Sequence, residues 1–304
     1  MADKVMSPMD ENCQTVAEKN EVGWKQFVLK ILKKYCIVHP SFLVIYLWFG
    51  ILILSIIKCL IEIPHSYFSE KSNFFNQFFV KWTWAWTVGV AGPYMMISSF
   101  VYGCDAWKKS MALSIFRIAI GTMIWHFWAN LVFHFVENLT GTCLSQDGMP
   151  DFNIDNKRDC VKLKQGHYWD GFDISGHCFL LTYSVLFINS EIQIYKNWCK
   201  ISKDAALYVP IGSKTLSNLK QRFRTTNSCI NILFVLNCIL SFIWVIMLIS
   251  TCLYFHTFLS KALGTVAAVL SWMATYNEWY KCTFSPGSPG DGPLKAIFGK
   301  LKIN

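Results

Sequence analysis

Two histidines stand out because each lies at the end of a long apolar segment, where a polar side chain can do chemistry. His177 follows Ser175 and Gly176 at the start of the apolar run 174–190. His256 comes shortly after the apolar run 229–251. Imidazole can act as a nucleophile or as a proton donor near neutral pH. Two histidines from separate segments therefore predict phosphoryl transfer, with one imidazole attacking phosphorus and the other protonating the leaving oxygen.

The residues around His177 also predict an anion-binding site. Gly176 allows a ligand to approach the backbone, and a helix that begins here offers free N–H groups and the positive end of its dipole to a phosphate. Asp173, Ser175 and Gly176 are thus candidates for phosphate binding. The same pattern fits a plain helix cap formed by Asp173 or Ser175, with His177 and His256 as ordinary interfacial residues.

Other histidines are candidates for a supporting role. His126, Asn130 and His134 recur every four residues and share one helical face, which is typical of a polar seam inside a bundle; His134, near the end of its segment, is also a candidate for catalytic support. His167 lies in the same stretch as His177 and is a second candidate. We expect no cofactor. A metal is not required either, because a helix terminus and basic side chains can hold phosphates, and the sequence has no carboxylate cluster typical of a Mg²⁺ site.

The elements that must position these residues are membrane-spanning helices. Of 304 residues, 53% are hydrophobic and 15% are charged, against roughly 25% charged residues in a soluble domain. A bilayer is crossed by about 20 apolar residues. The predicted fold is an all-α polytopic membrane protein, with a transmembrane domain at 41–280 between tails at 1–40 and 281–304. The six predicted spans are 41–61, 82–104, 115–136, 172–190, 229–251 and 258–277.

The distribution of basic residues predicts the orientation of these spans. The net charge is +9, and Lys and Arg concentrate in 1–40, 191–228 and 281–304. By the positive-inside rule these segments are cytoplasmic, which places both termini in the cytoplasm and His177 and His256 on the lumenal side. Since this rule accounts for the basic residues, nucleic-acid binding is not expected.

The loop before the fourth span carries two features of a lumenal segment. Asn138 begins an N-glycosylation sequon, whose modification is left open. Cys143 and Cys160 are the cysteines well inside this loop, and they predict a disulfide in an oxidising compartment. The lysines in the terminal segment 300–304 have the spacing of a retrieval signal for the endoplasmic reticulum, although an ordinary basic tail fits equally well.

Two stretches resemble a known family. The segment 171–184 closely resembles the signature of the fat-storage-inducing transmembrane (FIT) family, and Tyr254-Phe255-His256, with Trp272 and 277–280, resembles its C-terminal signature. The resemblance covers most of 40–282. This family is related to lipid phosphate phosphatases and is associated with acyl-CoA diphosphatase activity and lipid-droplet formation in the endoplasmic reticulum. The resemblance implies cleavage of the pyrophosphate of fatty acyl-CoA to acyl 4′-phosphopantetheine and adenosine 3′,5′-bisphosphate.

The resemblance also implies roles for the two histidines. Ser175-Gly176-His177 looks like the second phosphatase motif, with His177 as general acid, and His256 looks like the nucleophile of the third. The pattern departs from the wider superfamily because Ser260 stands where an Asp is usual, and because the first motif, a Lys and an Arg-Pro pair, is not found. Other cations must therefore neutralise the phosphates, with Lys261 as the first candidate. The remaining candidates are Arg158, Lys162 and Lys164.

A rival hypothesis is a non-catalytic protein that binds diacylglycerol or triacylglycerol and promotes droplet budding. Asn237 and Ser241 in the fifth span would then form the lipid site. A small-solute transporter is disfavoured, because only Gly92-Pro93 interrupts a span. The expected partners are fatty acyl-CoA in the enzymatic case, diacylglycerol, triacylglycerol and phospholipids of the endoplasmic reticulum, and proteins of that membrane or of lipid droplets.

Overall fold

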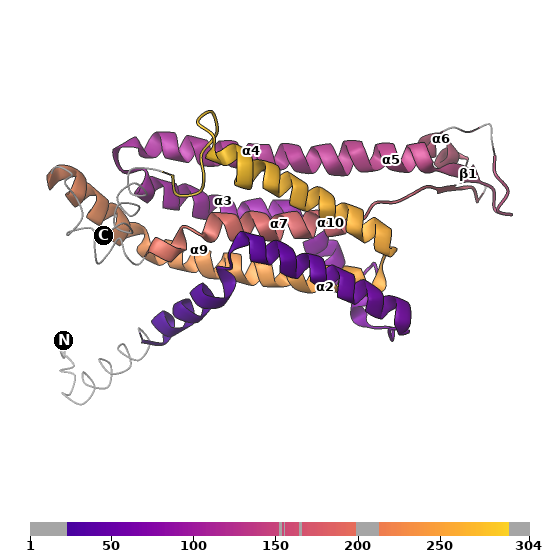
Figure 1. Cartoon of the computed structure of the whole chain (residues 1–304), viewed down its shortest axis with the longest axis horizontal. Helices are drawn as coiled ribbons and strands as arrows, with labels where there is room; N and C mark the ends of the chain where they lie inside the picture. Colours follow the sequence, from indigo (N-terminus) through magenta and orange to yellow (C-terminus); the bar gives the residue numbers. More distant parts are fainter. Residues whose placement is uncertain (1–22, 152–153, 155, 164–165, 199–212, 292–304) are drawn as a thin grey trace, which may run out of the picture.

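The chain forms a bundle of long helices that lie nearly side by side, with a small hairpin at one end (Figure 1). The structure is a computed structural model, and it describes residues 23–151, 154, 156–163, 166–198 and 213–291. Lys164 and the terminal lysines of 300–304 lie outside the described residues. The predicted all-α class is confirmed, because two three-residue strands are the only strands in these ranges.

Long helical segments make up the bundle. They are α2 (Pro40–Leu60), α3 (Thr83–Tyr102), α4 (Trp107–His126) continued by η4 (Phe127–Val132) and α5 (Phe133–Thr140), α7 (Gly176–Ile192), α9 (Ser213–Tyr254), and α10 (Phe258–Trp272) continued by η5 (Met273–Glu278). The shorter elements are η1 (Tyr67–Ser69), η2 (Phe75–Val80), η3 (Cys104–Ala106), β1 (Thr142–Leu144), α6 (Lys157–Lys162), β2 (Tyr168–Asp170) and η6 (Trp279–Lys281). A helical segment at 23–36 precedes α2.

Five of these helical segments are long and apolar enough to cross a membrane, which supports a multi-pass membrane protein. The segment predicted as the second span, now α3, is not among them, because its Trp, Tyr, Thr and Ser residues lower its hydropathy. Its neighbours shield it: Tyr94 and Met95 are fully buried, and α3 contacts α4, α7 and α9. A helix enclosed by other helices needs fewer apolar residues than one that faces lipid.

The helix α9 begins well before the predicted fifth span. Arg222 ties this polar extension to the end of α3, because its Nη1 donates to the carbonyl of Cys104 at 2.6 Å and its guanidinium lies 4.7 Å from the ring centre of Phe100. Favourable hydrogen bonding and cation–π contact thus keep helical a stretch that its composition marks as a loop.

The central helix of the bundle is α7, which carries His177 in its first turn. It contacts α2, α3, α9 and α10, and nearly all of its residues after the first turn are buried. Gly264 of α10 allows the closest approach, because a Cβ atom there would collide with the backbone carbonyl of Ser175. The start of α7 is therefore held firmly against α10.

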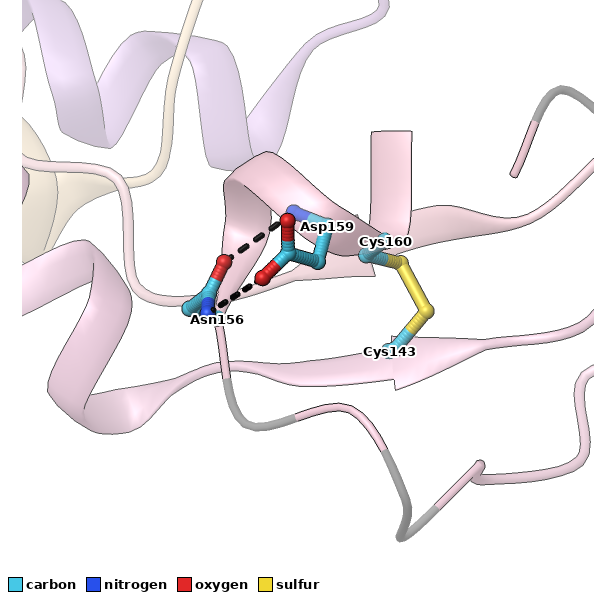
Figure 2. Close-up of a disulfide and its surroundings, with 4 residues drawn as sticks. All are labelled: Cys143, Asn156, Asp159 and Cys160. Carbon is cyan, nitrogen blue, oxygen red and sulfur yellow. Dashed lines mark hydrogen bonds between the residues drawn. A yellow bond between two sulfur atoms is a disulfide. The ribbon is translucent and has the colours of Figure 1, made fainter. Parts of the chain in front are cut away.

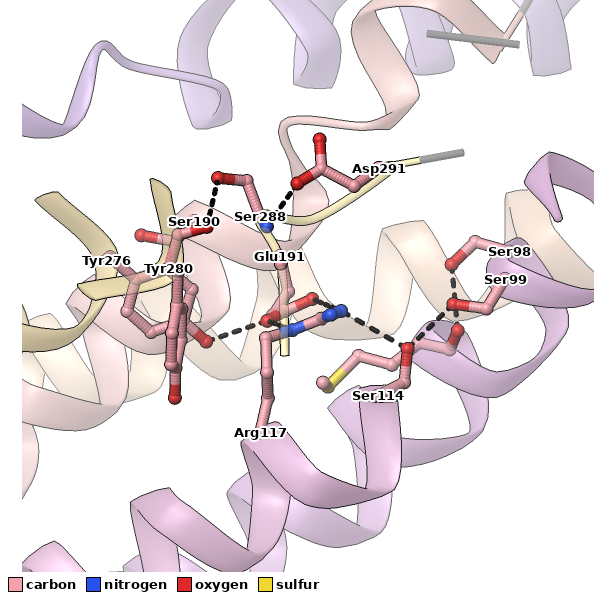
Figure 3. A network of polar contacts seen from close by, with 12 residues as sticks. Ser98, Ser99, Ser114, Arg117, Ser190, Glu191, Tyr276, Tyr280, Ser288 and Asp291 are labelled. Atoms are coloured by element: carbon pink, nitrogen blue, oxygen red, sulfur yellow. Dashed lines mark hydrogen bonds and ion pairs between the residues drawn. The ribbon is translucent and has the colours of Figure 1, made fainter. Parts of the chain in front are cut away.

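A buried ion pair fixes the other end of α7 (Figure 3). Nε and Nη2 of Arg117 on α4 donate to the two carboxylate oxygens of Glu191 at 2.9 and 3.0 Å. The hydroxyl of Tyr276 donates to the same carboxylate at 2.7 Å, and Ser114 accepts from Arg117 at 3.2 Å. Since α7 rises 1.5 Å per residue, this pair lies about 21 Å from His177. Arg117 is thus a structural residue, too distant to bind a phosphate at the histidines.

Candidate active site

His177 and His256 are displayed at the same end of the bundle. His177 lies in the first turn of α7 and is exposed, whereas His256 lies in the turn between α9 and α10 and is partly buried. The backbone of His256 has a φ of 54°, in the left-handed region that a few residue types, His among them, adopt more readily than others. The tight turn between the two helices requires this conformation.

Backbone hydrogen bonds join the two segments that carry the histidines. The N–H of Ser175 donates to the carbonyl of Ser260 at 3.2 Å, and the hydroxyl of Ser260 donates to the carbonyl of Asp173. Ser260 therefore joins the two segments through hydrogen bonds. It stands where the third motif usually has an Asp, and it brings no negative charge to His256.

Ser175 caps α7, because its Oγ accepts a hydrogen bond from the N–H of Cys178 at 3.2 Å. The cap interpretation is thus correct for the Ser175 side chain. The N–H groups of Gly176 and His177 have no acceptor within the part of the chain that the structure describes. A Cβ atom on Gly176 would meet nothing within 4 Å, so the space beside these two donors is open. This geometry suits an anion.

Asp173 faces His256. Its Oδ2 lies 3.6 Å from Nδ1 of His256, and 63% of the Asp173 side chain is exposed, against 22% for His256. The sequence suggested phosphate binding for Asp173, but a carboxylate charge repels phosphate. A carboxylate at Nδ1 is instead suited to orient the imidazole and to leave Nε2 available.

Lys58 of α2 contacts the His256 turn directly, which the sequence analysis missed. Its Nζ donates to the carbonyl of Phe255 at 3.1 Å and to that of His256 at 3.0 Å. The sequence did contain a signal for Lys58, because it is the one charged residue in the predicted span 41–61. Charges inside a membrane are costly and often functional. The contact itself joins residues far apart in the sequence.

Three lysines surround the histidines. Lys261, the predicted phosphate ligand, is 1% exposed, and its Nζ donates to the carbonyl of Cys252 at 2.8 Å. Its charge therefore acts on the site from inside the protein. Lys71, which the sequence analysis also missed, is exposed and within electrostatic range of both histidines.

The pKa of His256 is lowered mainly by burial of the imidazole. The charges of Lys71, Lys58 and Lys261 lower it further, and the Asp173 carboxylate opposes them by raising it. A lowered pKa keeps the imidazole neutral at neutral pH, and the neutral form is the one that can attack phosphorus.

The structure shows the local surroundings of the two histidines predicted as supporting residues. His134 is 60% exposed, and its Nδ1 lies 3.7 Å from Glu137, which also pairs with Lys157. Nδ1 of His167 is buried without a partner among the described residues. The structure records no bond from either histidine to His177 or His256 over the ranges given above.

A disulfide-bonded hairpin leads into the start of α7 (Figure 2). The structure joins Cys143 and Cys160, the two cysteines that the sequence pairs, with a Cα–Cα distance of 5.7 Å. β1 and β2 pair antiparallel, and the N–H of Phe172 donates to Oγ1 of Thr140 at 2.9 Å. The chain therefore reaches Asp173 from a braced loop.

The remaining predicted residues of this loop make local contacts, or none that the structure records among the described residues. Lys162 pairs with Asp159 at 2.9 Å, and Asp159 also accepts a hydrogen bond from Asn156 (Figure 2). Asn138 is exposed on α5, where a glycan would meet no obstruction from the bundle core. Arg158 makes no ion pair that the structure records over residues 156–163.

Asn237 and Ser241, the residues of the rival lipid-binding hypothesis, lie on α9. Asn237 is fully buried and donates to the carbonyl of Leu233 at 2.8 Å. The hydroxyl of Ser241 is buried without a partner among the described residues. Both groups therefore face protein.

The fold and the site define a class: a multi-pass helical membrane protein with two histidines at one end of its bundle, one of them facing a carboxylate. The model of the family described as fat storage-inducing transmembrane protein (FIT) matches residues 64–276, and the chain belongs to this family. The resemblance noted in the sequence is thereby confirmed.

Several relatives share most of the chain. The proteins named acyl-coenzyme A diphosphatase FITM2 from Xenopus tropicalis and Homo sapiens are 34% and 33% identical over 235 residues, which are 77% of this chain and 81% of each relative. The Drosophila melanogaster protein of that name is 31% identical over 259 residues, 80% of this chain and 59% of its own length. No solved structure matches this chain.

Proposed function

We propose that this chain is an acyl-CoA diphosphatase, which cleaves the pyrophosphate of fatty acyl-CoA to acyl 4′-phosphopantetheine and adenosine 3′,5′-bisphosphate. The names of its relatives support this activity. The observation that carries the proposal is the placement of His256 against Asp173, at the same end of the bundle as the exposed His177 at the start of α7.

In the proposed mechanism, Nε2 of His256 attacks one phosphorus of the pyrophosphate while Asp173 holds Nδ1. The bond from this phosphorus to the bridging oxygen breaks, and the bridging oxygen leaves with the other phosphate and takes a proton from His177. Water then attacks the phosphohistidine, and the now neutral His177 takes a proton from this water as the phosphorus–nitrogen bond breaks. This step releases the second phosphate product and regenerates neutral His256 and protonated His177.

The charge of the pyrophosphate is neutralised by the protein. The free N–H groups of Gly176 and His177 bind phosphate oxygens at the positive end of α7, and Lys71 approaches from the exposed side. Lys58, which donates to the His256 carbonyl, and the buried Lys261, which donates to the Cys252 carbonyl, supply further positive charge. The acyl chain stays in the bilayer, which it prefers to water by about 0.8 kcal/mol per CH₂, so the pyrophosphate is held at the membrane interface.

We also infer the topology that this reaction requires. When α3 is added to the five helical segments that are long and apolar enough, the chain crosses the membrane six times, and both termini are cytoplasmic. The histidines then face the lumen of the endoplasmic reticulum, where this activity supports lipid-droplet formation. The distribution of Lys and Arg and the Cys143–Cys160 disulfide support this orientation. Tags inserted in the hairpin loop and in 199–212 test it in sealed microsomes. Proteolysis of the hairpin tag without detergent would contradict the lumenal site.

The activity is tested with purified full-length protein and its His256→Ala and His177→Ala variants. Loss of His256 abolishes cleavage and any phosphohistidine, whereas loss of His177 lowers the rate by roughly 10²–10⁴-fold, because a proton donor contributes that much. A substrate whose leaving group needs no proton recovers part of the rate in His177→Ala alone.

His134→Ala is the matched control, because it removes an exposed imidazole that the structure pairs with Glu137. It retains activity. Full activity in His256→Ala or His177→Ala would refute the proposed reaction, and equal recovery in both would refute the division of roles.

A further inference from the structure

A groove lies between the helical segment 23–36 and α9, far from the histidines. It consists of two cavities, of about 700 and about 510 Å³, which share Leu29 and Asn231 in their walls. From Asn231 to the end of α9 at Tyr254 the helix rises about 35 Å, at 1.5 Å per residue. The groove is therefore separate from the proposed active site.

The larger cavity is lined by hydrogen-bond donors. Its polar walls include Lys30, Lys33, Asn227 and Asn231. Oδ1 of Asn227 accepts from Nε1 of Trp198 at 3.0 Å, and Oδ1 of Asn231 accepts from the hydroxyl of Tyr195 at 2.7 Å. These bonds engage both amide oxygens, and the structure records no partner for either N–H₂ group among the described residues. No carboxylate is among the described residues that line the cavity, which is thus complementary to an anion.

The smaller cavity is mostly apolar, with Lys25, Ser228 and Asn231 as its polar lining residues. Val28, Ile232, Val235 and Leu236 line it together with Leu29, and its volume suits hydrocarbon. The two cavities are continuous at Leu29 and Asn231, so an elongated ligand with an anionic end and an apolar end can occupy both.

The helical segment 23–36 has the character of a helix at the membrane surface. Trp24, Ile31 and Tyr35 are exposed at 66%, 39% and 66%, spaced to share one face, and lysines occupy other positions. Such a helix lies in the headgroup region. The groove beside it thus opens at the depth where phospholipid headgroups are found.

Hydrogen bonds anchor this segment to the bundle. Nδ2 of Asn189 donates to the carbonyl of Cys36 at 3.1 Å, and Nε2 of Gln193 donates to that of Val38 at 2.8 Å. The segment then slants away from the bundle beside α9 (Figure 1). These two bonds therefore hold the end of the segment against α7.

We propose that this groove binds a glycerophospholipid with an anionic headgroup. The phosphate and headgroup lie in the larger cavity against Lys30, Lys33 and the two amide groups, and one acyl chain lies in the smaller cavity. A zwitterionic lipid is a poorer fit, because its ammonium group meets the two lysines. The bound lipid fills the space between segment 23–36 and α9 and holds them in their observed positions.

The experiment measures lipid binding to purified full-length protein in neutral detergent by native mass spectrometry. The probes are phosphatidylinositol and phosphatidylcholine with identical acyl chains. We expect phosphatidylinositol to bind at least roughly tenfold more tightly, and Lys30→Gln/Lys33→Gln to remove most of this preference, because each lysine near an anionic headgroup contributes attraction. Equal binding of the two lipids by the unmodified protein would overturn the proposal.

Lys108→Gln/Lys109→Gln is the matched control, since it removes two exposed lysines at the start of α4, outside the groove. It leaves the lipid preference unchanged; a loss as large as that of the groove variant would show diffuse attraction and overturn the site. Val235→Trp fills the smaller cavity and weakens binding of phosphatidylinositol. Soluble glycerophosphoinositol, which has no acyl chains, competes only weakly with phosphatidylinositol. Competition as strong as that of the intact lipid would show that the smaller cavity does not bind an acyl chain. Retained acyl-CoA cleavage and melting temperature show that each variant is folded.

Discussion

Oδ2 of Asp173 lies 3.6 Å from Nδ1 of His256, although the two residues come from separate segments of the chain. A carboxylate in this position is suited to orient the imidazole, and we propose that Asp173 does so without contacting the phosphates. Asp173→Asn should therefore lower kcat, by roughly 10²–10⁴-fold for loss of a group that orients a catalytic imidazole. KM should change little. A large rise in KM at unchanged kcat, measured in steady-state assays, would instead assign Asp173 to substrate binding.

The pH dependence of kcat/KM should report the charges around His256. Burial and the neighbouring lysines lower its pKa, and Asp173 raises it. The reactive form is neutral, so activity falls as pH drops through this pKa. Lys71→Gln removes a charge that lowers the pKa and should move the acidic limb to higher pH, whereas Asp173→Asn should move it to lower pH. Shifts in the same direction would be inconsistent with the site.

Lys58 should act as a positioning residue for the His256 turn. Lys58→Met removes both hydrogen bonds to the carbonyls of Phe255 and His256, at a cost of about 1–3 kcal/mol for the groups left without a partner. We expect lower kcat and a lower melting temperature, with partial rescue by Lys58→Arg. Lys81→Met, at an exposed lysine, is the control. No rescue by Arg together with an unchanged melting temperature would contradict positioning through these bonds.

Gly264 and Gly176 should respond differently to an added methyl group. Gly264→Ala places Cβ against the carbonyl of Ser175, so α10 must move away from the start of α7, and both stability and activity fall. Gly176→Ala meets no protein atom and should leave the melting temperature nearly unchanged. It should raise KM for acyl-CoA, since the added group occupies the space where a phosphate approaches. An unaffected KM would place the phosphates elsewhere.

The buried pair of Arg117 and Glu191 should matter for stability rather than for catalysis. Glu191→Gln or Arg117→Met leaves one buried charge without its partner and should cost about 3–5 kcal/mol. The double variant Arg117→Met/Glu191→Leu should cost less than either single change, because no unpaired charge remains. Thermal unfolding in detergent measures both effects. Additive losses would show that the two residues act independently.

The sequence by itself determined the helical membrane class, most of the spans, the two histidines and the cysteine pair. These properties depend on local patterns: hydropathy over about 20 residues marks a span, and the Ser175-Gly176-His177 run marks a helix start whether or not its neighbours are known. Local composition was misleading for the start of α9, and it makes α3 the least apolar of the predicted spans. The surroundings of α3 offset its low hydropathy, and Arg222 stabilises the polar extension of α9 through Cys104 and Phe100.

Only the tertiary structure decided the partners of the catalytic candidates. The contacts of Asp173 and Lys58 with the His256 turn, and of Arg117 with Glu191, join residues on different helices or loops. No local periodicity encodes which charge meets which, because the packing angles and the positions of turns place these side chains. The Asp that the third motif lacks illustrates the reason, because the carboxylate that lies beside the His256 imidazole comes from Asp173, in another segment of the chain.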